Sequence, residues 1–190
     1  MWWPDIPSRR TRRCFLRLAG VVTLAGLTAG CFQPLYGDHA TVGGVGINDK
    51  LAGVDVAPID APNGTRLARI GVAVRDQLIY EMTGGGAAVA PTHKLVVKLS
   101  SKQLQVIVDI NTARPEIQNY GIDANYTLTD LRTGKPVITG QTFSRVSYDI
   151  PGQQQRFAGA RGLRDAENRA AKVISENIHA RLASFFVAGT

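Results

Sequence analysis

One cysteine and one row of lysines are the side chains whose type and spacing indicate chemistry in this chain. Cys31 comes directly after three small residues, Thr28-Ala29-Gly30, which end an uncharged apolar run over residues 18–27. Residues 1–17 before that run carry five arginines and one acid. A basic stretch, a short apolar stretch and small residues at a cleavage site make up a secretory signal. We therefore predict that residues 1–30 are a signal peptide and that Cys31 begins the exported chain.

The residues around Cys31 resemble the lipobox of bacterial lipoproteins, whose cysteine is acylated. Ala29 and Gly30 match it, whereas Thr28 stands where leucine is most frequent. The apolar run is too short for a transmembrane helix, which needs about 20 residues. We predict Cys31 as the lipid attachment site, the alternative being an ordinary free cysteine. Phe32 follows, not the aspartate that retains lipoproteins in the inner membrane, which implies the periplasmic side of the outer membrane.

The predicted signal peptide also contains a second export motif. Residues 11–17, TRRCFLR, resemble the twin-arginine export motif, although arginines enrich the start of any secretory signal. The general secretory route and the twin-arginine route both stay open, and both lead out of the cytoplasm.

Removal of residues 1–30 changes what composition implies. It leaves 160 of the 190 residues, enough for one domain with a core. Cys14 leaves with the signal, so Cys31 is the one cysteine remaining and no internal disulfide can form. The net charge falls from +7 to about +3, because the signal holds five arginines and one aspartate. The basic character of the whole chain therefore gives no support to a nucleic-acid partner.

The lysine row consists of Lys94, Lys98 and Lys102, which recur every fourth residue in an alternating segment. In a strand they share one face and span roughly 27 Å. Arg132 and Lys135 flank a turn further on. Such cations could bind the phosphates of a ligand. The alternative is a solvated face or a strand edge guarded against aggregation.

Catalytic motifs are missing from the sequence. His39, His93 and His179 are scattered, without the spacing of a zinc site, and we expect His179 on the exposed side of a helix. The chain has no Gly-x-Ser-x-Gly motif, and its glycine-rich residues 43–46 lack the lysine of a phosphate loop. We predict no enzyme, no metal and no cofactor.

The hydrophobic periodicity predicts the elements that must position these residues. Residues 31–50 form the tether, and residues 51–190 form a single domain. Period-two alternation and turn residues predict strands over 51–59, 93–108, 118–130 and 137–148. Period 3.6 predicts helices over 65–83 and 163–186. Gly134 is expected to have a positive φ, and blurred alternation suggests a bulge near Gly140.

The predicted fold class is α+β. The order β-α-β-β-β-α gives a two-layer sandwich of about four mostly antiparallel strands, covered on one face by two amphipathic helices. We see no repeat and no second domain.

At both ends the chain resembles the LptE family of LPS-assembly lipoproteins. The segment CFQPLYG, residues 31–37, resembles the start of the mature family members but lacks their glycine after the cysteine. The C-terminal part is similar through Tyr148, Arg156-Phe157-Ala158 and Asp165-Ala166-Glu167. The resemblance covers nearly all of residues 31–186.

The resemblance implies a non-catalytic role in lipopolysaccharide transport. LptE proteins plug the lumen of the LptD β-barrel in the outer membrane, help it to assemble, and bind lipopolysaccharide on its way to the outer leaflet. Residues 32–36 would then contact the barrel or lipid, or else pin the tether to the domain. The alternative is a lipid-shuttling or transporter-auxiliary lipoprotein, which needs an apolar cavity between helices and sheet. A structural envelope protein, with no specific barrel partner, is a third possibility.

Overall fold

The computed structural model describes residues 46–86, 89–108, 115–149 and 156–188. The chain divides into two compact units, Met1–Gly37 and Asp38–Thr190, and all described residues belong to the second. The predicted signal, Cys31 and residues 32–45 lie outside the described residues. The order is α2 (Ile47–Ala52), β1 (Val54–Val56), α3 (Arg66–Thr83), β2 (His93–Val108), β3 (Pro115–Asp130), β4 (Pro136–Asp149) and α4 (Arg156–Ala188).

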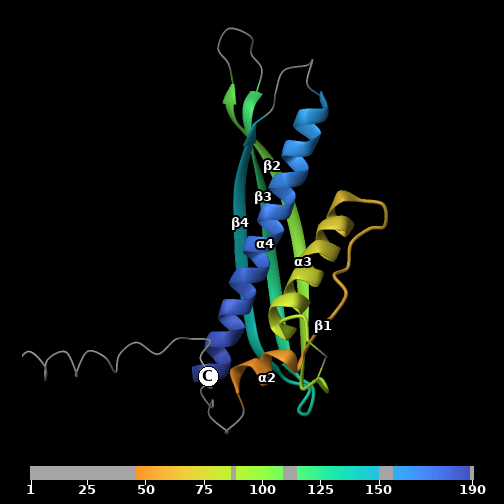
Figure 1. The fold of residues 1–190 in the computed structure, drawn as a ribbon, viewed down its shortest axis with the longest axis vertical. Helices are drawn as coiled ribbons and strands as arrows, with labels where there is room; N and C mark the ends of the chain where they lie inside the picture. The colour runs from red at the N-terminus through yellow and green to blue at the C-terminus, as the bar shows by residue number, and fades with distance from the viewer. Residues whose placement is uncertain (1–45, 87–88, 109–114, 150–155, 189–190) are drawn as a thin grey trace, which may run out of the picture. The chain divides into compact units, whose positions relative to one another are not determined.

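The four strands form one sheet in the order β1-β2-β3-β4, and α3 and α4 lie along one of its faces (Figure 1). β2, β3 and β4 pair antiparallel, whereas the short β1 pairs in parallel with the start of β2. The α+β sandwich that the sequence predicts is confirmed. The four mostly antiparallel strands and the two covering helices of that prediction are confirmed as well.

Helix α3 begins and ends where its sequence predicts. The hydroxyl of Thr65 accepts a hydrogen bond from the Ala68 N–H at 3.2 Å and caps the first turn. Gly84 adopts φ +61° and donates its N–H to the Tyr80 carbonyl at 2.8 Å, a left-handed cap that favours glycine. The buried face repeats every fourth residue through Ile70, Val74, Leu78 and Met82.

Three elements differ from the sequence prediction, the first being the strand predicted over 51–59, which is limited to Val54–Val56 because residues 51 and 52 belong to α2. The predicted tether extends to residue 50, but α2 begins at Ile47, and the side chains of Ile47 and Leu51 are each only 2% exposed. One apolar i, i+4 pair is too short a pattern to predict a helix. Formation of α2 must therefore depend on the burial of Ile47 and Leu51 in the tertiary structure. Helix α4 begins at Arg156 rather than at residue 163, so residues 156–162 are helical as well.

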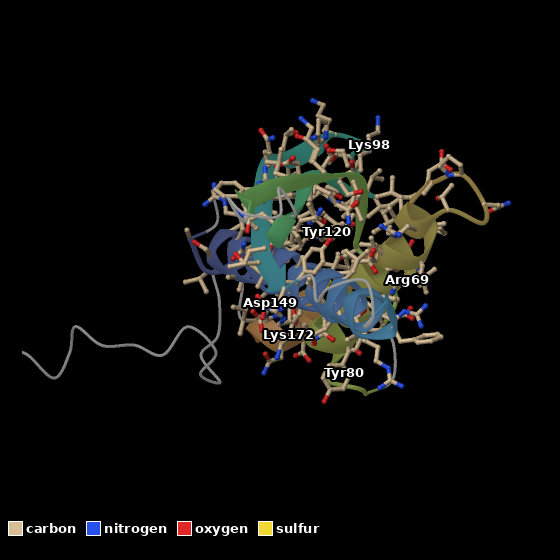
Figure 2. All side chains as sticks on the ribbon, turned by 90° about the horizontal axis from the view of Figure 1, so that it is seen from above. Arg69, Tyr80, Lys98, Tyr120, Asp149 and Lys172 are labelled. Carbon is tan, nitrogen blue, oxygen red and sulfur yellow. The ribbon has the colours of Figure 1, made fainter. Side chains whose placement is uncertain are left out.

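The core lies between the sheet and the two long helices. Figure 2 shows Tyr120 on the helix side of the sheet and Lys98 on the opposite side. Fully buried side chains come from both layers, among them Leu95, Tyr120, Ile122, Leu128, Ile174, Ile178 and Leu182. Alanines at 166, 170, 171 and 183 are buried on α4 and bring that helix close to its neighbours. Side chains therefore fill this layer along the middle of the sheet, whereas at its α2 end His93, Phe185 and Phe186 help to line a cavity of about 490 Å³.

The predicted bulge near Gly140 is wrong. The β3–β4 register runs evenly through the pair Tyr126–Gly140, and the irregularity lies between Leu128 and Thr129. The alternation is blurred because β4 turns small or polar residues, Gly140 among them, toward α4. A Cβ at Gly140 would lie 2.5 Å from the Tyr126 hydroxyl oxygen, so the missing side chain makes room for the buried Tyr126 ring.

We predict that Gly140→Ala lowers the free energy of unfolding by about 1–3 kcal/mol, because the new methyl group overlaps the Tyr126 ring. Gln141→Ala, the exposed next residue of the same strand, should change it by less than about 0.5 kcal/mol. Urea unfolding of the full chain measures both. Equal stability of the two variants would contradict the close Gly140–Tyr126 packing.

Candidate functional site

The candidate site is the sheet face that the helices leave uncovered, here called the open sheet face. Its predicted residues Lys94, Lys98 and Lys102 are all exposed, on alternate positions of β2 that point away from α3 and α4. The core residues Leu95 and Val97 alternate with them and lie on the buried side. The period-two prediction of one lysine-bearing face is confirmed.

 Because side chains alternate across a strand, burial of Leu95 and Val97 on one side of β2 places the three lysines on the other side.

Arg145 on β4 joins this face, and the sequence prediction missed it. The register sets Lys102 beside Gly121, and Gly121 beside Arg145. Gly121 has no side chain, and the Arg145 side chain lies over it. The Arg145 guanidinium pairs with Asp123 at 2.6 Å and lies 5.3 Å from the centre of the Phe143 ring. The sequence feature that could have placed Arg145 there is its odd position in β4, because the odd-numbered residues of a regular β4 strand all lie on one face.

The open sheet face carries Lys94, Lys98, Lys102 and Arg145 against the carboxylates of Asp55, beside Lys94 in the β1–β2 register, and of Asp123. Among the described residues, Lys94, Lys98 and Lys102 have no carboxylate within 4 Å, and Asp123 is already paired with Arg145. Exposed apolar side chains lie between the cations on the same strands: Val96, Leu104 and Phe143. A face that offers cations and apolar side chains together suits a ligand with both phosphate and hydrocarbon parts.

The predicted hairpin residues Arg132 and Lys135 lie on the exposed turn between β3 and β4. The Asp130 carboxylate accepts the Arg132 N–H at 2.7 Å, and this hydrogen bond lowers the pKa of Asp130. Gly134 has φ +67°, as predicted. Lys94 pairs with Thr129, which pairs in turn with Pro136. The turn therefore lies at the Lys94 end of the lysine row.

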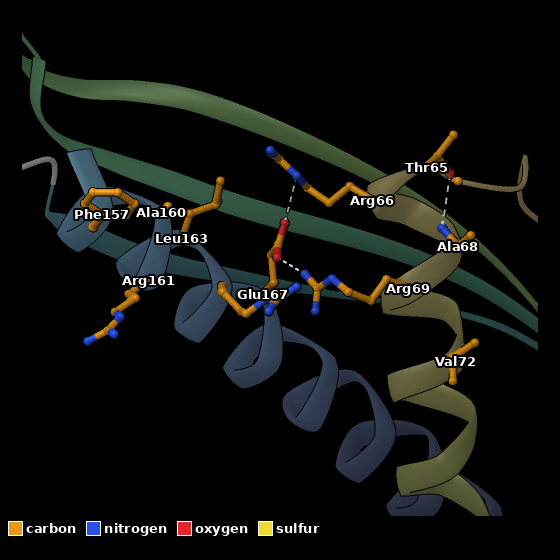
Figure 3. Close-up of a pocket in the computed structure, with 12 residues that line it drawn as sticks. Thr65, Arg66, Ala68, Arg69, Val72, Phe157, Ala160, Arg161, Leu163 and Glu167 are labelled. Carbon is orange, nitrogen blue, oxygen red and sulfur yellow. Dashed lines mark hydrogen bonds and ion pairs between the residues drawn. The ribbon is translucent and has the colours of Figure 1, made fainter.

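A second cationic region lies between the N-terminal halves of α3 and α4. A cavity of about 780 Å³ is lined there by four arginines, which are Arg66, Arg69, Arg161 and Arg164. We call it the arginine cleft. Figure 3 shows Arg66 and Arg69 reaching from α3 toward Glu167 on α4. The Glu167 side chain is 3% exposed, and its Oε1 lies 3.2 Å from the Arg66 Nε.

The charges of the arginine cleft do not cancel. Burial, together with repulsion from Arg164 and Arg66, lowers the pKa of Arg69. Within the described ranges no carboxylate lies within 4 Å of Arg161 or Arg164. The sequence prediction missed this region. The sequence feature that could have indicated the arginine cleft is the group of arginines near the start of each helix. Neither helix has an acidic residue in its first turn.

The two described histidines, His93 and His179, have separate surroundings. His93 packs edge-on against Phe186, with ring centres 5.2 Å apart. His179 is half-buried rather than on the exposed side of the helix, so that expectation is wrong. It lies one residue after the fully buried Ile178, and the wide buried stripe of α4 includes part of it. Over the described residues, no group of three His, Cys, Asp or Glu side chains could hold a metal ion.

The fold and its surfaces define a class of protein: a small α+β sandwich with a filled core and one uncovered cationic sheet face. The LptE family, described as lipopolysaccharide-assembly, matches residues 51–182. The chain belongs to the LptE family of lipopolysaccharide-assembly lipoproteins. Comparison with curated protein sequences gives no match. None of the described helices is both long enough and apolar enough to cross a membrane.

Solved structures support the same fold. A putative lipoprotein from Caulobacter crescentus is similar with a TM-score of 0.58 and 20% identity, over 76% of this chain and 97% of that one. Lipoprotein B from Nitrosomonas europaea is similar with a TM-score of 0.51 and 14% identity, over 73% of this chain and 90% of that one. At these identities the likeness concerns the fold alone.

We predict that Glu167→Gln lowers the free energy of unfolding by about 2 kcal/mol, because it leaves two arginines without their buried carboxylate. The effect stays below that of a fully buried pair, since the Arg66 and Arg69 side chains are 52% and 34% exposed. Asp165→Asn, which removes the exposed ion pair with Arg169 on the same helix, should cost less than about 0.5 kcal/mol. Chemical unfolding compares the two, and similar losses would contradict a structural role for Glu167.

We also predict that the protein loses stability as the pH falls from 7.5 to 5.5. Burial lowers the pKa values of His93 and His179, although the nearby Asp130 and Glu81 oppose the effect. The unfolded chain therefore takes up protons at a higher pH than the folded one, which favours unfolding below about pH 6.5. Unfolding free energies at both pH values should differ less for the variant His93→Gln/His179→Gln. An unchanged pH dependence in that variant would contradict the prediction.

Proposed function

We propose that this chain binds lipopolysaccharide on its open sheet face and works within an LptD-type β-barrel of the outer membrane. The observation that carries the proposal is the uncovered face on which Arg145 and three lysines, the lysines with no carboxylate of the described residues within 4 Å, lie among exposed apolar side chains. Membership of the LptE family supplies the lipopolysaccharide-assembly context.

The chemistry of lipopolysaccharide fits this face. Its lipid A and core carry phosphates, for which lysine is a point-charge partner, and its acyl chains need apolar contact. The lysine row extends over roughly 27 Å, so it can meet several phosphates of one extended molecule. Arg132 and Lys135 at the hairpin turn continue the cationic surface beyond Lys94 and form part of the proposed site.

The role as a plug rests on the filled core. A protein that shuttles single lipids must enclose their acyl chains in an apolar cavity. Here the layer between helices and sheet is occupied by side chains such as Leu95, Ile122 and Ile178, each 0% exposed. A solid domain with a polar outer sheet face suits the wet interior of a barrel. The filled middle of the layer favours the plug, whereas the cavity of about 490 Å³ beside His93 and Phe186 is where the lipid-shuttling alternative would have to hold an acyl chain.

The anchor in the proposal is Cys31. Acylation there, with palmitate or a similar fatty acid, would hold the domain at the periplasmic side of the outer membrane and raise its effective concentration near the barrel. No catalytic step is part of the proposal, and neither a nucleic acid nor a cofactor takes part.

Removal of two lysines tests the binding face. We predict that Lys98→Gln/Lys102→Gln weakens lipopolysaccharide binding by the full-length protein about tenfold, since two exposed charge contacts of about 0.7 kcal/mol each are lost. Calorimetric titration with lipopolysaccharide micelles measures the affinity. The matched control is Lys172→Gln/Arg181→Gln, which removes two exposed charges from α4.

The control should bind as the unaltered protein does. If both double variants lose the same affinity, binding follows net charge and not the open sheet face. If neither loses affinity, the face is not the binding site.

A further inference from the structure

The arginine cleft has features that the open sheet face does not explain. It lies in the helix layer, on the other side of the sheet from the lysine row, and four arginines line it, two of which pair with the buried carboxylate of Glu167. Glu167 can neutralise only one of those four charges. The cleft therefore holds about three uncompensated positive charges.

We propose that the arginine cleft is a second binding site, which takes a phosphate monoester group. The group could belong to the headgroup of a phosphorylated glycolipid or to a small soluble phosphate. Only the glycolipid source rests on the function proposed above.

Electrostatics favours an anion at this place. Arginines near a helix N-terminus face the positive end of the helix dipole, and here both helices begin beside the cleft without an acidic residue in their first turns. Arg164 and Arg66 repel the charge of Arg69, so the three cations destabilise one another. A doubly charged ligand would relieve this repulsion.

Arginine geometry favours phosphate. A guanidinium carries five N–H donors in a planar fork, which matches two phosphate oxygens. Arg66 and Arg69 use part of their forks for Glu167 and are still 52% and 34% exposed, so donors remain for a ligand. Glu167 holds these two side chains in place before the ligand arrives, which lowers the cost of ordering them.

The surroundings of the cleft fit a phosphate joined to a larger body. Phe157 and Val72 line it and are 88% and 60% exposed, and they offer apolar contact beside the cations. A cavity of about 780 Å³ accommodates a phosphorylated sugar.

The test compares Arg161→Gln/Arg164→Gln with Lys172→Gln/Arg181→Gln in the full-length protein. Both double variants remove two exposed charges from α4, but the control residues do not line the cleft. One probe is inorganic phosphate against chloride at equal ionic strength, read as the rise in melting temperature. The other is bisphosphorylated lipid A in micelles against dephosphorylated lipid A, read by calorimetry.

We expect the cleft variant to lose at least about tenfold in affinity for one of the two phosphate probes, and the control to keep it. Loss confined to bisphosphorylated lipid A identifies the glycolipid headgroup. Loss of the response to inorganic phosphate identifies a small anion. Equal behaviour of both variants toward both probes would overturn the proposal. Lys98→Gln/Lys102→Gln in the same titrations separates the two sites, because an effect of that pair alone supports only the sheet face.

Discussion

Burial of only one face of the sheet is the constraint on which the rest of this structure depends. Two long helices cover that face and fill the layer beneath with leucine, isoleucine and small alanine side chains. The other face must then present side chains that tolerate water, and this chain places lysines there together with exposed apolar residues. The same asymmetry that stabilises the domain thus creates the uncovered face on which the proposed binding site lies.

The overall architecture could be predicted because strands and helices bury residues at different periods. The alternation in β2 and β3 and the four-residue repeat in α3 were visible in the sequence. Gly140 misled the prediction because its role depends on the Tyr126 ring across the strand pair, which the sequence of one strand does not show. Helix α2 was missed because its two buried residues form no repeat.

Part of the candidate site could likewise be predicted from the sequence, and part of it could not. Lys94, Lys98 and Lys102 follow directly from period two, whereas Arg145 needed the β3–β4 register that sets it beside Gly121. The arginine cleft depends on how α3 and α4 lie against each other. Residues 66–69 and 161–167 are about a hundred positions apart, and only the packed helices bring Arg69 to Glu167. No local pattern could have indicated that pair.

The central claim is that the open sheet face is covered by a barrel and its lipopolysaccharide in the outer membrane. A photo-crosslinking residue at Gln141, which is exposed on that face, tests it in cells that produce the full-length tagged protein. After purification from outer membranes, we predict crosslinks to a large β-barrel protein or to lipopolysaccharide, and an acylated Cys31 by mass spectrometry. A free thiol at Cys31 with no crosslinked partner would contradict the account.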